Sequence, residues 1–130
     1  MERGITIMDR YAGFLGIEVL DYGHGEAKAK LQIGENHLNS HGNVHGGAIF
    51  SLADTAFALA SNSRDGLAMA INVNIAYFKA KSSGLLYAAA REVSLKSRLA
   101  TYVVDITDEE GTAIALFQGT VYRRVHNQPV

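Results

Sequence analysis

Cysteine and tryptophan are absent from the 130-residue sequence, and proline occurs once. Without cysteine the chain has no disulfide framework, thiol nucleophile or thiolate-ligated metal site. Its 12 basic and 13 acidic side chains nearly cancel, which gives no electrostatic indication of a nucleic-acid or anionic-membrane partner. No apolar run has the length of a signal peptide or a membrane span. We therefore expect a soluble, cytoplasmic protein that binds neither nucleic acid nor membranes.

Length and composition predict one domain. A chain of 130 residues with 48% hydrophobic residues is ordinary for a globular protein and can bury roughly two thirds of its unfolded surface. No repeat, linker or low-complexity segment divides it. We expect residues 1–130 to form a single domain around one hydrophobic core.

A polar loop rich in histidine and asparagine, residues 36–47, runs directly into the apolar segment 48–62. Apolar side chains in this segment cover nearly the whole circumference of a helix, which is typical of a buried helix. A narrow polar stripe interrupts them, formed by Ser51, Asp54 and Thr55 and continued at Asn62. We therefore expect Asp54 to be a carboxylate on a helix that the rest of the protein surrounds.

The start of this helix predicts a binding place for a negatively charged oxygen. The first N–H groups of a helix have no intrahelical acceptor, and the helix dipole places roughly half a positive charge there. Because Gly46 and Gly47 have no side chains, a ligand oxygen can approach their N–H groups, as in an oxyanion hole. Asp54 follows Gly46 by eight residues, about 12 Å along the helix axis, too far for both to contact one reacting carbon. If the two residues cooperate, Asp54 comes from a second copy of the chain.

Periodicity elsewhere predicts an antiparallel sheet. Residues at helical spacing predict a short amphipathic helix that ends near Gly13 or Gly16, namely Ile5, Met8, Tyr11, Ala12 and Leu15. Alternating runs predict strands at 17–22, 26–33, 69–77, 85–95, 99–107 and 112–123. In the run 69–77 the apolar residues share one face, and Asn72 and Asn74 share the other. Because only the central helix is a long crossover, we expect the strands joined by short links to be antiparallel neighbours. The pattern is α+β, an antiparallel sheet of five to six strands wrapped around one long central helix.

Motifs in the loop and the central helix carry a family resemblance. The first is Asn39-x-x-Gly42-x-x-His45-Gly46-Gly47, followed by Phe50-x-Leu52-Ala53-Asp54-Thr55-Ala56-Phe57 and by Ala60-x-Asn62. The strand near 74–79 and the hairpin near 108–112 also lie where the family has them. Together these segments resemble the PaaI-type hotdog-fold acyl-CoA thioesterases of phenylacetic acid degradation. The resemblance implies a hotdog fold and hydrolysis of an acyl-CoA to free acid and CoA, with no cofactor.

The resemblance also implies roles for loop and helix residues. The Gly46 N–H, with Gly47 near the same helix end, polarises the thioester carbonyl, and Asp54 of a partner subunit acts as nucleophile or as general base. Asn39 helps to hold the attacking water or the thioester, or else is a turn residue that bonds its own backbone. His45 donates towards the thioester or fixes the loop. Asp54 has a structural alternative too, as a carboxylate hydrogen-bonded at a subunit interface.

Substrate-binding residues are predicted less directly. Phe50 and Phe57 line the acyl pocket or, as is usual for aromatic residues on a buried helix, belong to the core. Many relatives carry Ser or Thr on the partner strand that faces the Asp, where this chain has alanine, so either Asn72 substitutes or the site has fewer partners. Lys79 and Arg98, at strand ends or in turns, bind the phosphates of CoA or are ordinary solvated charges.

The family suggests an aryl substrate, such as phenylacetyl-CoA or hydroxyphenylacetyl-CoA, although no residue distinguishes this from a medium-chain fatty acyl group. It implies a homodimer whose sheets join edge to edge, with dimers pairing into a homotetramer. Two other functions stay open. One is a hotdog hydratase or dehydratase of enoyl or hydroxyacyl thioesters, and the other is a non-catalytic acyl-CoA-binding module.

Three histidines in the loop recur at a spacing of four, namely His37, His41 and His45. On a helix this spacing would align them as zinc ligands. Gly42 and the neighbouring asparagines disfavour a helix here, so we expect no metal site.

Overall fold

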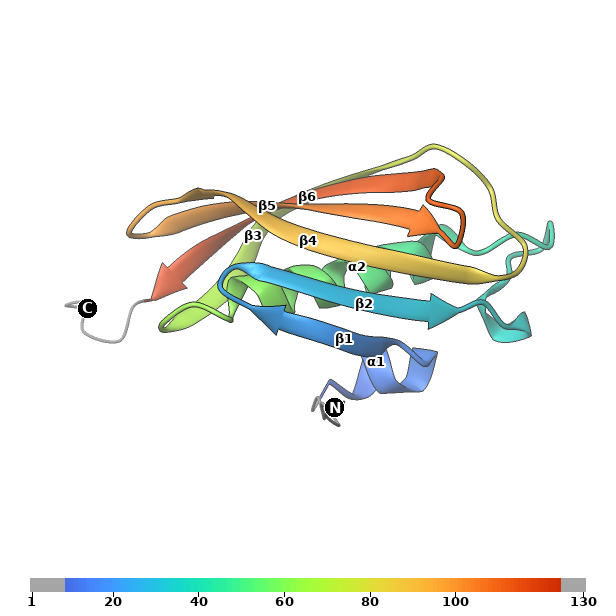
Figure 1. The fold of residues 1–130 in the computed structure, drawn as a ribbon, viewed down its shortest axis with the longest axis horizontal. Helices are drawn as coiled ribbons and strands as arrows, with labels where there is room; N and C mark the ends of the chain where they lie inside the picture. The colour runs from blue at the N-terminus through green and yellow to red at the C-terminus, as the bar shows by residue number, and fades with distance from the viewer. Residues whose placement is uncertain (1–8, 125–130) are drawn as a thin grey trace.

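Six antiparallel strands and one long helix make up the computed structural model, which describes residues 9–124 (Figure 1). In chain order the elements are α1 Arg10–Leu15, β1 Glu18–Gly23, β2 Glu26–Gln32, the 3-10 helix η1 Glu35–His37, α2 Gly46–Ser61, β3 Leu67–Tyr77, β4 Leu85–Leu95, β5 Leu99–Asp108 and β6 Ala113–Arg124. Between residues 9 and 124 no helix is both long and apolar enough to cross a membrane. Ile5 and Met8 of the predicted N-terminal helix lie outside the described range.

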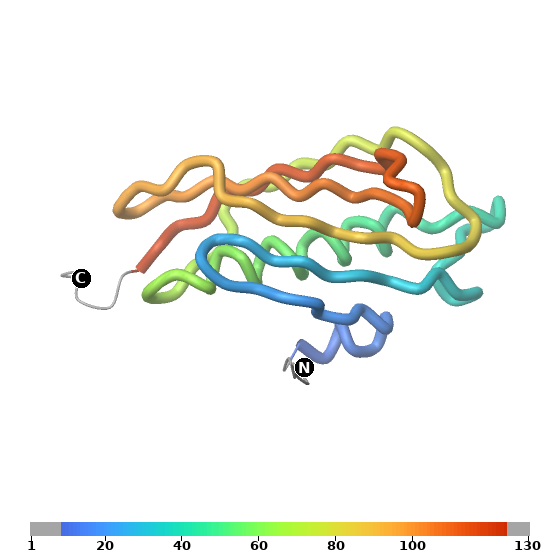
Figure 2. The backbone as a smooth tube through the Cα atoms, in the orientation of Figure 1, coloured from blue at the N-terminus to red at the C-terminus, as the bar shows by residue number. Residues whose placement is uncertain are grey.

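The strands form one sheet in the order β1-β2-β4-β5-β6-β3, and all neighbouring pairs are antiparallel. Strands β1 and β3 are therefore the two edges. The chain crosses from β2 to the far edge through α2, as the tube in Figure 2 shows. The expectation that short links join neighbours is wrong for β3 and β4, because residues 78–84 run across the end of the sheet and β5 and β6 lie between these strands. The predicted α+β hotdog arrangement is confirmed.

Small residues let α2 lie close against the sheet. Leu52, Ala53, Ala56 and Ala60 of α2 have 0% exposed surface, and contacts of the helix with β2, β4 and β5 bury this side. The predicted buried helix is confirmed, and it begins at the glycine pair. Burial of apolar surface between helix and sheet is the main force that fixes the position of α2.

A short N-terminal helix and a hairpin are present as predicted, although Tyr11, from the predicted apolar face of the helix, is 61% exposed. The Asp9 side chain caps α1 by accepting from the Ala12 N–H at 3.1 Å, and the helix ends at Gly16, whose φ of 85° favours glycine. Strands β1 and β2 form the expected hairpin, and the alternating residues of β2 point into the core.

Strand β3 departs from the predicted alternation in its first half. The register with β6 shifts between Ala70 and Asn72, which leaves Ile71 as an extra residue and reverses the alternation. After the shift Val73 packs against the core, and Asn72 lies on the opposite face, as predicted. Before it Met69 is 58% exposed and does not share the face of Val73. The prediction of one continuous apolar face is therefore wrong.

Candidate active site

The loop before α2 is a turn built around the side chain of Asn39. Its Oδ1 accepts hydrogen bonds from the backbone N–H groups of His41 at 2.9 Å and Asn43 at 3.1 Å. Its own N–H donates to the Asn43 carbonyl at 2.7 Å, and Gly42 takes a φ of 81° within the turn. The side-chain oxygen of Asn39 is thus occupied by hydrogen bonds from backbone N–H groups. Its Nδ2 has no acceptor among residues 9–124, so a ligand can still accept a hydrogen bond from it.

His45 caps the N-terminus of α2. Its Nδ1 accepts a hydrogen bond from the Gly47 N–H at 2.8 Å, and its backbone N–H donates to the His37 carbonyl at 2.7 Å. Because Nδ1 is an acceptor, the neutral ring carries its proton on Nε2. The residue is exposed, so this Nε2–H can reach a ligand. The cap supports the loop-fixing role of His45 and leaves its outer nitrogen as a donor.

Capping by His45 leaves Gly46 as the residue with a free N–H. The Gly47 N–H is already bonded to His45, whereas the Gly46 N–H has no acceptor in the described part of the chain. Gly46 is the first residue of α2, so its N–H lies at the positive end of the helix dipole. In this arrangement only Gly46 keeps a free N–H at the start of α2, because the N–H of Gly47 is committed to the cap.

Asp54 lies in the middle of α2 and is half-buried. Burial raises the pKa of its carboxyl group, and the neighbouring negative charge of Asp9 raises this pKa further. No cation or hydrogen-bond donor between residues 9 and 124 pairs with it. The structural alternative, a carboxylate hydrogen-bonded at a subunit interface, would therefore need its partner from a second subunit. Gly46 and Asp54 stay on one unbroken helix and do not meet in the same chain.

Tyr77, which the sequence did not single out, contacts Gly46. Its hydroxyl donates a hydrogen bond to the Gly46 carbonyl at 3.0 Å. A Cβ placed on Gly46 would lie 3.2 Å from the Tyr77 Cζ, so a larger residue at this position would press against the ring. The sequence signal was weak, since an aromatic residue at the end of a strand is common and nothing in the pattern linked it to the loop.

The two phenylalanines predicted to bind the acyl group differ in burial. Phe57 is 1% exposed, and its ring packs between Tyr102 and Phe117 at centroid distances of 5.9 and 5.3 Å. The structure places Phe57 in the core, because Gly119 leaves room for its ring there. Phe50 is partly exposed, with its ring edge-on to Phe117 at 5.4 Å, and it remains available to a ligand.

The other predicted substrate contacts are not brought together in one chain. Asn72 pairs with Thr120, which bonds Thr101 on the exposed side of the sheet, so its side chain faces away from α2. This position does not suit a substitute for the missing Ser or Thr. Lys79 is exposed just beyond β3, whereas Arg98 lies in the β4–β5 turn at the other end of the sheet, where it donates to the Tyr122 hydroxyl at 3.1 Å.

The three loop histidines have separate roles. His37 accepts from the Gly34 N–H through Nδ1 at 2.9 Å, and its Nε2 is 2.8 Å from the Leu15 carbonyl, which ties the loop to α1. His45 caps α2, and His41 is exposed. Within residues 9–124 no three His, Asp or Glu side chains are grouped as metal ligands.

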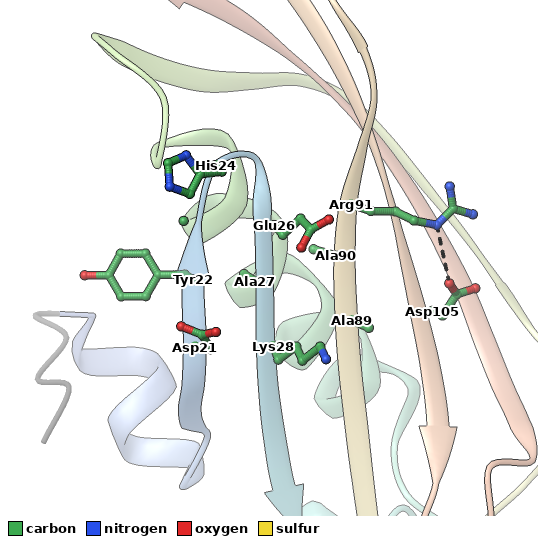
Figure 3. A pocket seen from close by; sticks show the side chains of 11 residues that line it. Asp21, Tyr22, His24, Glu26, Ala27, Lys28, Ala89, Ala90, Arg91 and Asp105 are labelled. Atoms are coloured by element: carbon green, nitrogen blue, oxygen red, sulfur yellow. Dashed lines mark ion pairs between the residues drawn. The ribbon is translucent and has the colours of Figure 1, made fainter. Parts of the chain in front are cut away.

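A hollow of about 540 Å³ lies away from this site, over β1, β2, β4 and β5 (Figure 3). Its floor includes Ala89, and Lys28, Arg91 and Asp105 project around it. Neither Gly46 nor Asp54 lines it. The hollow is therefore separate from the candidate site on α2, which carries the free N–H and the unpaired carboxylate.

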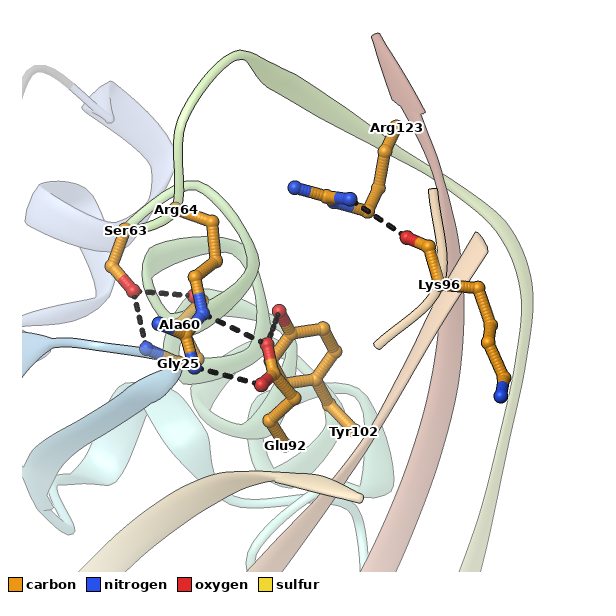
Figure 4. Close-up of polar contacts among 8 residues, drawn as sticks. All are labelled: Gly25, Ala60, Ser63, Arg64, Glu92, Lys96, Tyr102 and Arg123. Atoms are coloured by element: carbon orange, nitrogen blue, oxygen red, sulfur yellow. Dashed lines mark hydrogen bonds and ion pairs between the residues drawn. The ribbon is translucent and has the colours of Figure 1, made fainter. Parts of the chain in front are cut away.

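A second polar cluster ties the end of α2 to the sheet (Figure 4). Glu92 on β4 accepts hydrogen bonds from Arg64 at 2.8 and 3.1 Å and from the Tyr102 hydroxyl at 2.7 Å. Ser63 accepts from the Gly25 N–H at 2.8 Å and so links the β1–β2 hairpin to the same place. The polar side chains of this cluster pair with one another, which indicates a structural role.

Comparison with known proteins identifies relatives of the whole arrangement. The sequence profile of the thioesterase superfamily matches residues 41–115, from the loop before α2 to the start of β6. The acyl-coenzyme A thioesterase PaaI of Escherichia coli is 33% identical over 116 residues, which cover 88% of this chain and 83% of the relative. A mutant of the phenylacetic acid degradation protein PaaI from Thermus thermophilus has a similar structure, with a TM-score of 0.86, 43% identity and coverage of 89% of this chain and 100% of that one. A hypothetical thioesterase from Streptococcus pneumoniae, solved with coenzyme A, has a TM-score of 0.80 at 25% identity and covers 86% and 88% of the two chains.

Proposed function

The chain belongs to the thioesterase superfamily and is a hotdog-fold thioester hydrolase, and we propose that it hydrolyses acyl-CoA at a site shared between two subunits. One observation carries the proposal: α2 holds both a free N–H at its start, on Gly46, and an unpaired half-buried carboxylate, Asp54, near its middle. The helical rise separates them by about 12 Å, so two copies of α2 are needed to bring both to one carbonyl carbon.

The chemistry follows from these two groups. The thioester oxygen accepts a hydrogen bond from the Gly46 N–H, which stabilises the negative charge that develops when the carbonyl carbon is attacked. In the general-base route, Asp54 of the partner subunit takes a proton from water while the hydroxyl adds to the carbon, and collapse expels the CoA thiolate, which is then protonated. In the nucleophilic route, the carboxylate adds directly, the thiolate leaves, and water hydrolyses the resulting anhydride. Both routes stay open.

The surroundings of Asp54 suit either route. A carboxylate without a cation partner and with a raised pKa is a stronger base and nucleophile than one held in an ion pair. The outer nitrogen of His45 and the Nδ2 of Asn39 are two further donors in the loop that leads to Gly46. We assign them to holding the thioester or the water, while their other atoms fix the loop.

A homodimer joined through β3 supports this sharing. Strand β3 is an edge with apolar residues at the surface, including Leu67, Met69 and Ile71 at 55%, 58% and 58% exposure. Antiparallel pairing of two β3 strands would cover this edge and place the two α2 helices on the same side of a continuous sheet. We further propose that dimers pair into a tetramer. A monomer in sedimentation at micromolar concentration would rule out the shared site.

The dimer also gives a place for coenzyme A. Two-fold pairing brings the end of one β3 beside the start of the other, so Lys79 of one subunit and Arg98 of its partner would lie at the same end. We propose that these two cations bind the CoA phosphates. For the acyl group we propose an aryl substrate such as phenylacetyl-CoA, on the basis of the PaaI relatives, with Phe50 as the aromatic contact. The proposal includes a single domain over residues 1–130 and a cytoplasmic location.

The test is hydrolysis of an acyl-CoA panel, aromatic and straight-chain, followed by release of free thiol. Asp54→Asn keeps the size of the side chain and is expected to abolish turnover while the protein stays folded. Asp105→Asn makes the same change on the opposite face of the sheet and should retain wild-type turnover. Full activity of Asp54→Asn would refute the role of Asp54. If the wild type hydrolyses no thioester but hydrates an enoyl thioester, the hydratase alternative is supported. If it hydrolyses no thioester and only binds acyl-CoA, the binding module is supported.

A further inference from the structure

Tyr77 makes a contact that bears on the proposed oxyanion donor. It is the last residue of β3, and the strand is held there by pairing with Ala115 and by the Phe78 N–H, which donates to the Ile114 carbonyl at 2.8 Å. The tyrosine is therefore anchored on the sheet. Its hydroxyl reaches the loop-to-helix junction and donates to the Gly46 carbonyl at 3.0 Å.

The ring occupies the side of Gly46 where any other residue would carry its side chain. A Cβ on Gly46 would lie 3.2 Å from both Cζ and the hydroxyl oxygen of Tyr77, closer than about nine in ten such contacts. Glycine is the residue with the greatest backbone freedom, so a glycine N–H on its own is a poorly oriented donor. Packing of the ring together with the hydrogen bond to the carbonyl restricts this freedom and leaves the N–H side open.

We propose that Tyr77 is a positioning residue that restrains the backbone of Gly46 through its carbonyl and its Cα. This restraint orients the preceding His45–Gly46 peptide, so that the Gly46 N–H points to the thioester oxygen. The proposal rests on the proposed function for its catalytic consequence. A donor fixed in advance stabilises the transition state without reorganisation. Tyr77 therefore acts on the reaction through Gly46, and the effect appears in kcat more than in KM, because the hydrogen bond to the oxyanion strengthens as charge develops.

The test compares Tyr77→Phe, which removes only the hydroxyl, with Tyr77→Ala, which also removes the ring. Loss of one hydrogen bond to the Gly46 carbonyl is expected to lower kcat about three- to ten-fold with KM changed less than about two-fold. Tyr77→Ala should lower kcat further. Tyr87→Phe is the matched control, since Tyr87 lies on the face of β4 that points away from the core, and it should leave both constants unchanged.

A second readout needs no turnover. In protein labelled with 15N-glycine, the Gly46 amide signal is expected to shift and broaden in Tyr77→Phe, while Tyr87→Phe leaves it unchanged. An unchanged Gly46 signal, or a kcat equal to wild type, would overturn the positioning role. Absence of thioester turnover in the wild type would instead refute the proposed function, and the amide signal would still decide whether Tyr77 orders Gly46.

Discussion

Replacement of Glu92 by glutamine is expected to destabilise the fold measurably. The Glu92 carboxylate accepts three hydrogen bonds, two from Arg64 and one from Tyr102, and its side chain is 14% exposed (Figure 4). Glutamine keeps the shape and one acceptor oxygen, but it removes the charge and turns a donor towards the guanidinium. A hydrogen bond to a charged group contributes about 1.5–3 kcal/mol. Because the Arg64 side chain is 32% exposed, water replaces part of this, and we expect a loss of about 2 kcal/mol in unfolding free energy.

The loss corresponds to a melting temperature lower by about 7 °C for a domain of this size. The pH dependence of this stability difference shows whether the charge of Glu92 is its cause. Hydrogen bonds from Arg64 and Tyr102 outweigh burial and hold the pKa of Glu92 below its ordinary value. The stabilisation is therefore complete above the unfolded pKa, about 4.3, and is lost as the pH falls through the lower folded pKa.

Thermal unfolding followed by circular dichroism measures both effects. The difference between wild type and Glu92→Gln should be full at neutral pH and should close in acid. Glu110→Gln, at an exposed turn position, is the matched control and should melt with the wild type. Equal melting temperatures of wild type and Glu92→Gln at neutral pH would refute this reasoning, as would a difference that persists in strong acid.

Two further predictions concern α2. Because burial and Asp9 raise the pKa of Asp54, activity should fall with decreasing pH at a value above the ordinary carboxyl pKa of 3.8. Asp9→Asn retains the cap of α1 and should move this acidic side of the pH–rate profile to lower pH. An unchanged profile would exclude Asp9 as a cause of the raised pKa. Gly119→Ala should lower the free energy of unfolding by about 1–3 kcal/mol, seen as a lower melting temperature, because its Cβ would lie 2.6 Å from the buried Phe57 ring. Adding Phe57→Leu should restore part of the loss. A single variant as stable as the wild type would show that the ring can move.

Local periodicity was sufficient to predict most of the fold. The apolar circumference of segment 48–62 indicated the buried helix, and the alternation of residues 26–33 indicated the hairpin, because both signals depend on neighbours in sequence. The positions of Gly46 and Asp54 on one helix followed from the same reasoning. Helical geometry alone then indicated that, if Gly46 and Asp54 cooperate, Asp54 comes from a second copy of the chain.

The remaining features depend on contacts between distant residues. The reversal of faces at Ile71 arises from the register with β6, which alternation along β3 alone does not reveal. The contact of Tyr77 with Gly46 joins positions 31 apart in sequence. Phe57 of α2 fills the core rather than a pocket because Gly119, on strand β6, leaves space for its ring. The position and tautomer of His45 decide that Gly46, and not Gly47, keeps a free N–H.

The central claim, a site shared between two subunits, is tested by restoring activity from two inactive variants. Asp54→Asn lacks the carboxylate, and Gly46→Pro lacks the N–H at the first helical position, where proline is best tolerated. Gly46→Ala is the control, because it adds a Cβ against Tyr77 but keeps the N–H.

The measurement is acyl-CoA hydrolysis by the two variants co-expressed with different tags. Random pairing makes about half of the dimers mixed. In a mixed dimer, one of the two sites combines the intact Gly46 of one chain with the intact Asp54 of the other. The predicted activity is therefore about a quarter of wild type, all of it in the doubly tagged fraction. A doubly tagged fraction as inactive as either variant alone would contradict the account, because it would place Gly46 and Asp54 of one site in the same chain.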